Sequence, residues 1–264
     1  MGCKIVADDY GMSLEINQAI SELVKKNILS KVSVMANESI SYHVNDINNN
    51  VEIGLHINLV SNPEIVRTNQ NKKKTSLLKL LYFLYTGQLA IKNILDSINQ
   101  QCKILESRGF EISCLDTHQH VHIVPRILKA VITYAKTKGI GAIRCITMEK
   151  RYLIYYFYSL IRFGFMKQLP KMILLYLMGI VMRMKFDKAG IAYCGNLILM
   201  PLATGGDYAG LLKDFLNKFK GKDTEIIIHP GLETEENSGD GYMGRYIEYL
   251  SILQQESWCR REKI

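Results

Sequence analysis

Residues 5–9 of this 264-residue chain read Ile5-Val6-Ala7-Asp8-Asp9, a short apolar run that ends in two carboxylates. A run of this length and composition is typical of a strand that is buried on both faces. Polar side chains follow directly after an apolar run in three later segments, Ile53–His56, Ile112–His118 and Ile226–His229. The carboxyl ends of parallel strands face one side of an α/β fold, so we expect these polar side chains to meet at one mouth.

Helical periodicity alternates with these runs. Ile16, Ile20 and Leu23 recur at helical intervals after the first run, and Ser13 stands where a helix cap is expected. Further helices are predicted near 76–85, 89–108, 125–138 and 207–220, further strands at 32–36, 52–59, 114–115, 141–145 and 225–228, and an exposed loop at Asn69–Lys74. Alternating strands and helices are typical of a parallel sheet or barrel. No repeat or proline-rich linker divides the chain, so we predict a single domain over residues 1–264.

The charge of the chain is concentrated in one region. The formal net charge is +8, with 48% hydrophobic and 22% charged residues, which is ordinary for a folded protein. Between Arg144 and Lys188, nine basic residues stand against two acidic ones, Glu149 and Asp187. Basic surfaces attract nucleic acid, anionic lipid or acidic substrates. No nucleic-acid-binding motif or base-stacking pattern accompanies the charge, so we predict no nucleic-acid partner.

The same region is unusually apolar. Within residues 152–184, apolar and aromatic runs are interrupted by Arg162, Lys167 and Lys171. Neither half reaches the roughly 18–20 uninterrupted apolar residues that a membrane-spanning helix needs. We expect a hydrophobic helical insertion or lid at about 146–190 that packs on the domain or on the second subunit of a homodimer. In the alternative, the region rests on an anionic membrane surface and presents the site to a lipid-linked substrate.

The cysteines of the chain show no C-x-x-C pairing. They are Cys3, Cys102, Cys114, Cys145, Cys194 and Cys259. In a chain of this length, scattered cysteines indicate reduced thiols and a cytoplasmic location rather than a disulfide framework. A strand-like segment begins at Cys3, so we expect no signal peptide.

Residues 116–122 read Asp-Thr-His-Gln-His-Val-His and hold half of the six histidines of the chain. If this segment is extended, its period of two places Asp116, His118, His120 and His122 on one face. Three imidazoles and a carboxylate on one face suit a divalent metal ion and the groups that orient its ligands. Histidines in an exposed loop are the alternative interpretation.

The acids and histidines at the other strand ends have a structural and a functional interpretation. By themselves, Asp8 and Asp9 fit a turn, His56 fits a core histidine, and His229 fits the bend that follows its strand. Beside a metal-binding cluster, two adjacent acids can divide the work. One binds the ion, and the other stays free as a base.

Together and in this order, these segments resemble the YdjC-like family (ChbG/HpnK type) of carbohydrate deacetylases. The matching segments are Ala7–Ser13, Gly54–Leu59, Asp116–His122 and His229–Gly231, with weaker matches at Arg144, Arg245 and Glu248. The resemblance implies a distorted (β/α) barrel, similar to a TIM barrel. It also implies a metal-dependent hydrolase that removes the acetyl group from an N-acetylated amino sugar or short oligosaccharide.

The resemblance further implies a role for each polar residue at the mouth. The implied metal ligands are Asp9, His56 and His118. Asp8 would be the general base, His229 the general acid, and Arg144 would line the site and orient Asp8. One divalent metal ion is implied, magnesium by resemblance, although two histidines and one carboxylate also suit zinc, iron, cobalt or nickel.

Two other functions are compatible with these residues. A metal-dependent phosphoesterase with a multinuclear site needs more ligands than the six histidines readily provide. A non-catalytic sugar-binding protein on the same fold would bind sugar without turnover, and the complete set of acids and histidines argues against it. Phosphatase activity without deacetylase activity would favour the first, and binding without turnover would favour the second.

Overall fold

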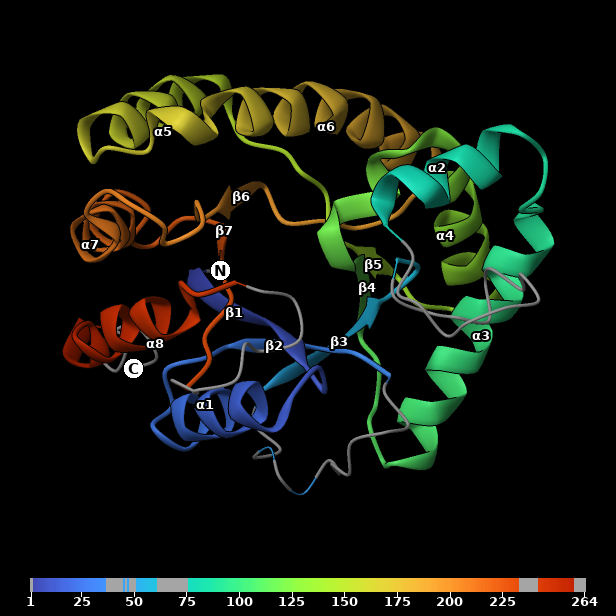
Figure 1. Cartoon of the computed structure of the whole chain (residues 1–264), viewed down its shortest axis with the longest axis horizontal. Coiled ribbons are helices and arrows are strands. Elements are labelled where there is room, and N and C mark those ends of the chain that lie inside the picture. Colours follow the sequence, from blue (N-terminus) through green and yellow to red (C-terminus); the bar gives the residue numbers. More distant parts are fainter. Residues whose placement is uncertain are drawn as a thin grey trace.

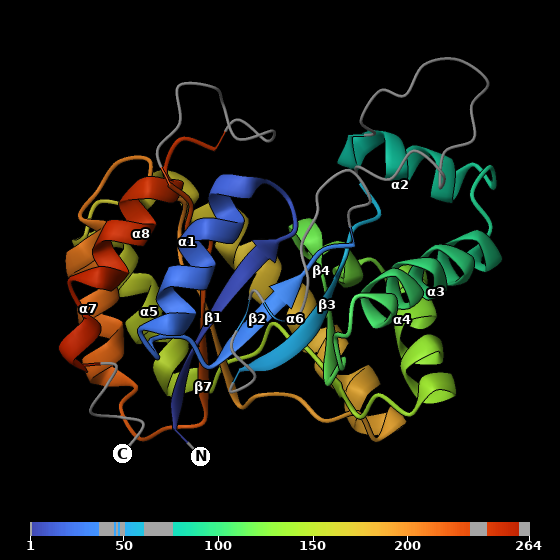
Figure 2. The same cartoon turned by 90° about the horizontal axis from the view of Figure 1, so that it is seen from below.

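A seven-stranded parallel sheet with helices around it forms the described part of the chain. The structure is a computed structural model, and it describes residues 2–36, 45, 47, 51–60, 76–232 and 242–258. The strand order is β5-β4-β3-β2-β1-β7-β6, and every neighbouring pair is parallel. The curled sheet and its helices form a distorted (β/α) barrel in a single domain, which confirms the predicted fold class (Figure 1, Figure 2).

Most elements lie where the sequence predicts them. The strands are β1 (Cys3–Tyr10), β2 (Lys31–Val34), β3 (Glu52–Ile57), β4 (Cys114–Thr117), β5 (Ala142–Ile143), β6 (Asn196–Leu199) and β7 (Thr224–Ile228). The α-helices are α1 (Leu14–Lys25), α2 (Leu77–Tyr85), α3 (Ile91–Ser107), α4 (Pro125–Lys138), α5 (Lys150–Arg162), α6 (Leu169–Ala189), α7 (Tyr208–Lys218) and α8 (Arg245–Leu253). Two 3₁₀-helices, η2 (His118–Ile123) and η3 (Met166–Gln168), complete the described elements.

The two edges of the sheet approach each other after β5 and before β6. The backbone N–H of Ile143 donates to the carbonyl of Ala192 at 3.1 Å, and the N–H of Ala192 donates to Gly141 at 2.9 Å. The N–H of Leu197 in β6 donates to the carbonyl of Thr147 at 2.8 Å. These bonds surround an isolated bridge and not a continuous ladder, so the barrel is distorted at this point.

Local capping fixes the chain where β1 passes into α1. Ser13 accepts a hydrogen bond from the backbone N–H of Ile16 at 3.3 Å, so it caps the helix as predicted. The side-chain oxygen of Asn17 accepts from the N–H of Gly11 at 2.6 Å. Ile16 and Leu23 are buried against the sheet side of the helix. The residues just before this turn are therefore held in place from both sides.

Helices α5 and α6 pack together along one side of the sheet, in the region expected as an insertion or lid (Figure 1). The hydroxyl of Tyr156 in α5 donates to the carbonyl of Leu199 at 2.7 Å, and that of Tyr176 in α6 donates to Leu197 at 2.6 Å. Both carbonyls belong to β6, so the tyrosines satisfy acceptors on an edge strand. Among the described helices, none has the length and apolar character needed to cross a bilayer. The movement implied by a lid remains a prediction.

A glycine allows α6 to touch the barrel backbone. A Cβ atom built on Gly179 would lie 1.6 Å from the carbonyl oxygen of Ile146, which follows β5. Only a hydrogen atom fits at this position, because the opposing atom belongs to the backbone and cannot rotate away. The close approach fixes the middle of α6 on the sheet.

The extended conformation predicted for residues 116–122 is wrong beyond Thr117. β4 ends at this residue and η2 follows. Gln119 and His120 adopt left-handed φ angles of 55° and 54°. The hydroxyl of Thr117 accepts a hydrogen bond from the backbone N–H of His122 at 3.1 Å, which closes the turn. The period of two is lost here, so the three histidines do not share a face.

Among the described strands and α-helices, β6 and α8 were not predicted from the sequence. The predicted loop Asn69–Lys74 and the thiol of Cys259 lie outside the described residues. The other five cysteines form no disulfide among the described residues, and the reduced state remains a prediction. The cytoplasmic location remains a prediction.

We predict that Gly179→Ala lowers the free energy of unfolding by about 3 kcal/mol, because the added methyl group forces α6 away from the backbone after β5. Urea unfolding followed by circular dichroism measures this change. Gly141→Ala is the matched control, since a Cβ atom there meets nothing within 4 Å. Equal stability of the two variants would contradict the close contact at Gly179.

Candidate metal-binding and catalytic site

The polar residues predicted at strand ends come together at one mouth of the barrel. They are Asp8 and Asp9 of β1, His56 of β3, Asp116 of β4, His118 directly after β4, Arg144 directly after β5 and His229 directly after β7. Parallel strands place their carboxyl ends on one side of the sheet, which explains why residues so distant in sequence meet. All of them are buried except His229, which is partly exposed.

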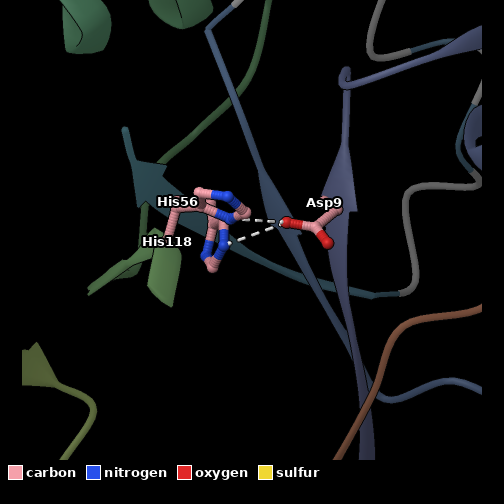
Figure 3. A group of neighbouring side chains, drawn as sticks. All are labelled: Asp9, His56 and His118. Atoms are coloured by element: carbon pink, nitrogen blue, oxygen red, sulfur yellow. Dashed lines mark hydrogen bonds and ion pairs between the residues drawn. The ribbon is translucent and has the colours of Figure 1, made fainter. Parts of the chain in front are cut away.

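Asp9, His56 and His118 form a compact group (Figure 3). The Oδ1 atom of Asp9 lies 3.3 Å from Nε2 of His56 and 3.1 Å from Nδ1 of His118. The ligand atoms of all three residues lie within 4.8 Å of one another. One carboxylate oxygen therefore faces two imidazole nitrogens at a single point.

This group fits a divalent cation. Ligand atoms about 2.1 Å from one ion lie roughly 3.0–3.4 Å apart at octahedral or tetrahedral angles. The two distances from Asp9 Oδ1 fall in this interval. Two imidazoles and one carboxylate are a common catalytic donor set, because they leave coordination positions open for water and substrate. Asp9, His56 and His118 could therefore hold such an ion.

An irregularity in β1 brings two consecutive acids to the same mouth. In a regular strand, Asp8 and Asp9 would point to opposite faces of the sheet. The pairing of β1 with β2 shifts register between Ala7 and Tyr10, and Asp9 has a φ angle of 72°. This left-handed conformation is unfavourable for residues other than glycine but is tolerated best by aspartate and asparagine. The shift turns Asp9 toward the histidines while Asp8 still faces the barrel interior.

Arg245 of α8 neutralises the outer oxygen of Asp9. Its Nη2 atom lies 2.7 Å from Asp9 Oδ2. Burial raises the pKa of Asp9, but Arg245 and the hydrogen bonds with His118 and His56 outweigh it and hold the pKa well below the usual range. Asp9 is therefore ionised, with one oxygen on the arginine and the other on the imidazoles.

Asp116 orients the imidazole of His56 through the ring nitrogen that does not face Asp9. Its Oδ1 atom pairs with Nδ1 of His56, and its Oδ2 atom accepts from the hydroxyl of Ser33 at 2.6 Å. Burial lowers the pKa of His56, but Asp116 and Asp8 outweigh it and raise the pKa to about 10. The negative potential that holds a proton on this imidazole also favours a divalent cation next to it. The pairing leaves Nε2 of His56 pointing to Asp9.

Arg144 holds Asp8 with two hydrogen bonds. Its Nη1 atom donates to Asp8 Oδ2 at 2.6 Å, and its Nη2 atom donates to Asp8 Oδ1 at 2.8 Å. The same Nη2 atom lies 3.0 Å from Asp116 Oδ2. Asp8, His56 and Asp116 also have ligand atoms close together. Arg144 already places a positive charge on both carboxylates, so this second group is a weaker metal site than the first.

His229 faces Asp8 from β7. Its Nε2 atom lies 4.0 Å from Asp8 Oδ2, and its side chain is 23% exposed. The backbone N–H of His229 donates to Oε2 of the buried Glu248 at 2.7 Å. Glu248 also accepts hydrogen bonds from the hydroxyls of Tyr208 (2.8 Å) and Tyr242. Glu248 therefore fixes the backbone at His229, and its Oε2 atom also lies 3.9 Å from Nδ1 of the imidazole, whose Nε2 atom faces Asp8.

His120 and His122 lie outside the group of Asp9, His56 and His118. His122 points inward, with Nδ1 beside the hydroxyl of Thr117 and Nε2 at 3.0 Å from the carbonyl of Arg144. Burial lowers the pKa of His122 to about 4, so this imidazole is neutral. It supports the backbone that carries Arg144.

Several site residues were missed or only weakly indicated by the sequence. Ser33, Tyr208 and Tyr242 gave no signal, while Arg245 and Glu248 appeared only as weak family matches. Arg245 and Glu248 lie three residues apart at the start of α8, so they share one face of that helix. A polar pair at this spacing on an otherwise apolar helix face could have indicated that Arg245 and Glu248 belong to the site.

A distorted (β/α) barrel with a histidine–carboxylate cluster at its strand ends defines a class of proteins built to bind a small ligand or metal at this mouth. The sequence profile of the YdjC-like proteins matches residues 4–259. The chain therefore belongs to the YdjC-like family.

Curated relatives align with about half of the chain. A carbohydrate deacetylase of Clostridium beijerinckii is 26% identical over 137 residues, which are 51% of this chain and 56% of the relative. A chitooligosaccharide deacetylase of Escherichia fergusonii is 24% identical over 140 residues, 51% of this chain and 56% of the relative. A carbohydrate deacetylase of Danio rerio is 28% identical over 136 residues, 47% of this chain and 42% of the relative. The matched part thus spans only about half the length of these relatives.

A solved structure supports the fold over the whole chain. The "putative cellobiose-phosphate cleavage protein" of Enterococcus faecalis V583 superposes with a TM-score of 0.65, covering 99% of this chain and 95% of that chain. The two sequences are 14% identical. At this identity the likeness concerns the fold alone.

We predict that the metal-stripped protein binds one divalent ion, and that the double variant His56→Ala/His118→Ala binds none while keeping its fold. Both side chains lie at strand ends and do not contribute to the packing of the hydrophobic core. Isothermal titration calorimetry measures binding, and circular dichroism checks the fold. His120→Ala is the control and should bind like the wild type, because His120 is not part of the group around Asp9. Tight binding by the double variant would refute the ligand assignment.

Proposed function

We propose that this chain is a metal-dependent carbohydrate N-deacetylase that hydrolyses the acetamide group of an N-acetylated amino sugar or short oligosaccharide. The observation that carries the proposal is the position of Asp8 and His229. They face each other beside the group of Asp9, His56 and His118. The names of the relatives support the substrate class, since they describe carbohydrate and chitooligosaccharide deacetylases.

Asp9, His56 and His118 would hold the cation. A divalent ion at this point would polarise the amide carbonyl and acidify a water molecule. The resemblance of the sequence implies magnesium, whereas two imidazole donors favour zinc or another transition ion. Reconstitution of the metal-free protein with each ion in turn distinguishes these.

Asp8 is the proposed general base. Its two hydrogen bonds with Arg144 fix the carboxylate, and its Oδ2 atom also lies 4.0 Å from Nε2 of His229. Asp8 would accept the proton of the attacking water as its oxygen bonds to the amide carbon. Arg144 acts here as a positioning residue, because its hydrogen bonds are directed to carboxylates and leave little freedom to contact substrate.

His229 is the proposed general acid. It would donate a proton to the amide nitrogen as the carbon–nitrogen bond breaks, which releases the free amine and acetate. Its Nε2 atom lies 4.0 Å from Asp8 Oδ2. This separation is too long for direct proton transfer, so the proton would return from Asp8 to His229 through one water molecule after product release, which would restore both groups for the next turnover.

The geometry disfavours a phosphoesterase with a multinuclear site. Such a site requires a second ion at about 3.5–4 Å from the first. The nearest second group contains Asp8 and Asp116, and Arg144 already bonds to both. The guanidinium supplies the positive charge that a second ion would otherwise supply.

Mass spectrometry tests the proposed reaction. Metal-loaded protein is incubated with N-acetylglucosamine, short chitooligosaccharides and other N-acetylated amino sugars, and the products are analysed for loss of one acetyl group and release of acetate. Hydrolysis of an aryl phosphate without deacetylation would instead favour a phosphoesterase. Sugar binding without turnover by the metal-loaded protein would favour a non-catalytic binding protein.

We predict that Asp8→Asn retains the metal but lowers the turnover number by ~10²–10⁴-fold, since the amide cannot accept the water proton. Asp9→Asn should instead weaken metal binding, because it removes the carboxylate shared by both imidazoles. Turnover assays at saturating metal, together with titration calorimetry, separate the two effects. Equal metal affinities and equal residual rates of the two variants would disprove the division of labour.

We predict that His229→Ala slows the hydrolysis of alkyl acetamides far more than that of activated anilides. An activated anilide leaves with little protonation, whereas an amino sugar nitrogen requires a proton donor. The ratio of turnover numbers for the two substrate types is the measurement. An equal loss on both types would assign His229 a structural role only.

A further inference from the structure

Helix α6 is apolar on the side that faces away from the sheet as well as on the side that packs on it. The large apolar side chains on its outer side are between 39% and 67% exposed, and they are Ile173, Leu174, Leu177, Ile180, Val181 and Met184. Their spacing of three and four residues places them in one stripe along the helix. A helix that is apolar all around is normally covered on both sides. The outer side of α6 therefore requires a covering partner.

Helix α5 and the segment after it also carry exposed apolar residues. Ile154, Tyr158 and Ile161 recur at helical intervals along α5 and are 75%, 59% and 49% exposed. Met166 in η3, between the two helices, is 61% exposed. α5 and α6 form an outer layer on one side of the sheet (Figure 1). We call the exposed apolar residues of this layer the α5–α6 face, and its extent exceeds that of scattered surface residues.

Basic residues flank the uncharged apolar segments of α5 and α6 along the chain. Between residues 150 and 189 they are Lys150, Arg151, Arg162, Lys167, Lys171, Arg183, Lys185 and Lys188, and all are exposed. Two acidic residues lie beside them, Glu149, which pairs with Arg151, and Asp187, which pairs with Arg183, so the basic residues remain in excess. The basic residues lie near the helix ends, and the segments 152–161 and 172–182 carry no charge. An apolar centre is thus bordered by positive charge.

This charge distribution selects between the candidate partners. A second copy of the chain packed through a two-fold axis would present the same face to itself. The basic borders of both copies would then meet and repel each other. An anionic lipid surface instead offers negative headgroups to the basic residues and a hydrocarbon boundary to the apolar ones.

We propose that the α5–α6 face is a peripheral binding surface for bilayers that contain anionic lipid. Both helices would lie in the plane of the headgroups, with the exposed stripe inserted at the boundary with the acyl chains and the basic residues at the phosphates. α6 also packs against η2, which begins at His118, so the surface and the candidate site share a structural neighbour. The proposal does not depend on the chemistry of that site.

Co-sedimentation of the full-length protein with vesicles tests the proposal. Vesicles of phosphatidylcholine alone are compared with vesicles containing about a third phosphatidylglycerol. We expect sedimentation with the anionic vesicles, little with the neutral ones, and a decrease as NaCl rises from about 0.1 M to about 0.5 M, because salt screens the basic residues. Failure to sediment with anionic vesicles at low salt would overturn the proposal.

A matched pair of triple variants distinguishes binding through this surface from binding through the net charge of the protein. Lys167→Glu/Lys171→Glu/Lys185→Glu is compared with Lys25→Glu/Lys92→Glu/Lys103→Glu, which changes exposed lysines of α1 and α3 by the same amount. Each basic residue near an anionic surface contributes about fivefold to the partition coefficient, so the first triple should lose on the order of a hundredfold. The second triple should lose far less. Equal losses would assign binding to net charge and overturn the proposal.

A second matched pair of variants tests the contribution of the exposed apolar residues to vesicle binding. Leu177→Glu removes an exposed leucine from the centre of the α5–α6 face, and Leu14→Glu removes one of nearly equal exposure from α1, on the other side of the sheet (57% and 58%). Leu177→Glu should lower partitioning at least about tenfold, because burial of its side chain is lost. Leu14→Glu should leave it unchanged. A dimer that Leu177→Glu dissociates, without vesicle binding by the wild type, would assign the face to a second copy.

Discussion

Three carboxylates buried at one mouth of the barrel set the condition that the rest of the site must satisfy. Asp8, Asp9 and Asp116 are each at most 1% exposed, and a buried carboxylate is costly unless a cation or several donors face it. Arg144 forms salt bridges with Asp8 and Asp116, while Arg245 forms one with Asp9. Three negative charges against two positive ones leave an excess of negative charge beside the two imidazoles. This excess favours positive charge beside Asp9 and Asp116, either a bound cation or a proton on His56, whose pKa is raised.

The barrel can gather these charges because β1 departs from regular geometry at the point where they occur. Parallel strands deliver one inward-pointing residue at each strand end, and two adjacent acids require an additional turn of the backbone. The left-handed conformation of Asp9 supplies it, at a cost of about 1–3 kcal/mol. The hydrogen bond from Gly11 to Asn17 and the salt bridge to Arg245 hold this conformation. The strained backbone at Asp9 therefore directs Asp8 and Asp9 into different environments.

The predictability of each feature depends on whether its cause is local. A buried strand followed by a polar residue is a local pattern, so the barrel and its strand-end residues could be predicted. The pairing of Arg245 with Asp9 joins residues 236 positions apart, and no short pattern encodes it. The hydrogen bond between Thr117 and His122 closes a turn that a period-two reading of the histidines cannot reveal. The strand β6 is a short apolar run that periodicity alone cannot distinguish from a buried helix.

The basic residues at the N-terminal ends of α5 and α6 are poorly placed for helix stability. The partial positive charge at a helix N-terminus favours acidic residues there, and basic residues favour the C-terminus. Arg162 in the last turn of α5 and Lys188 in the last turn of α6 agree with this rule, but neither helix has an acidic residue in its first turn. Lys150 and Arg151 open α5, and Lys171 lies in the first turn of α6, against the dipole in each case. Helix stability does not explain these positive charges, whereas a requirement for positive charge around the exposed apolar stripe does.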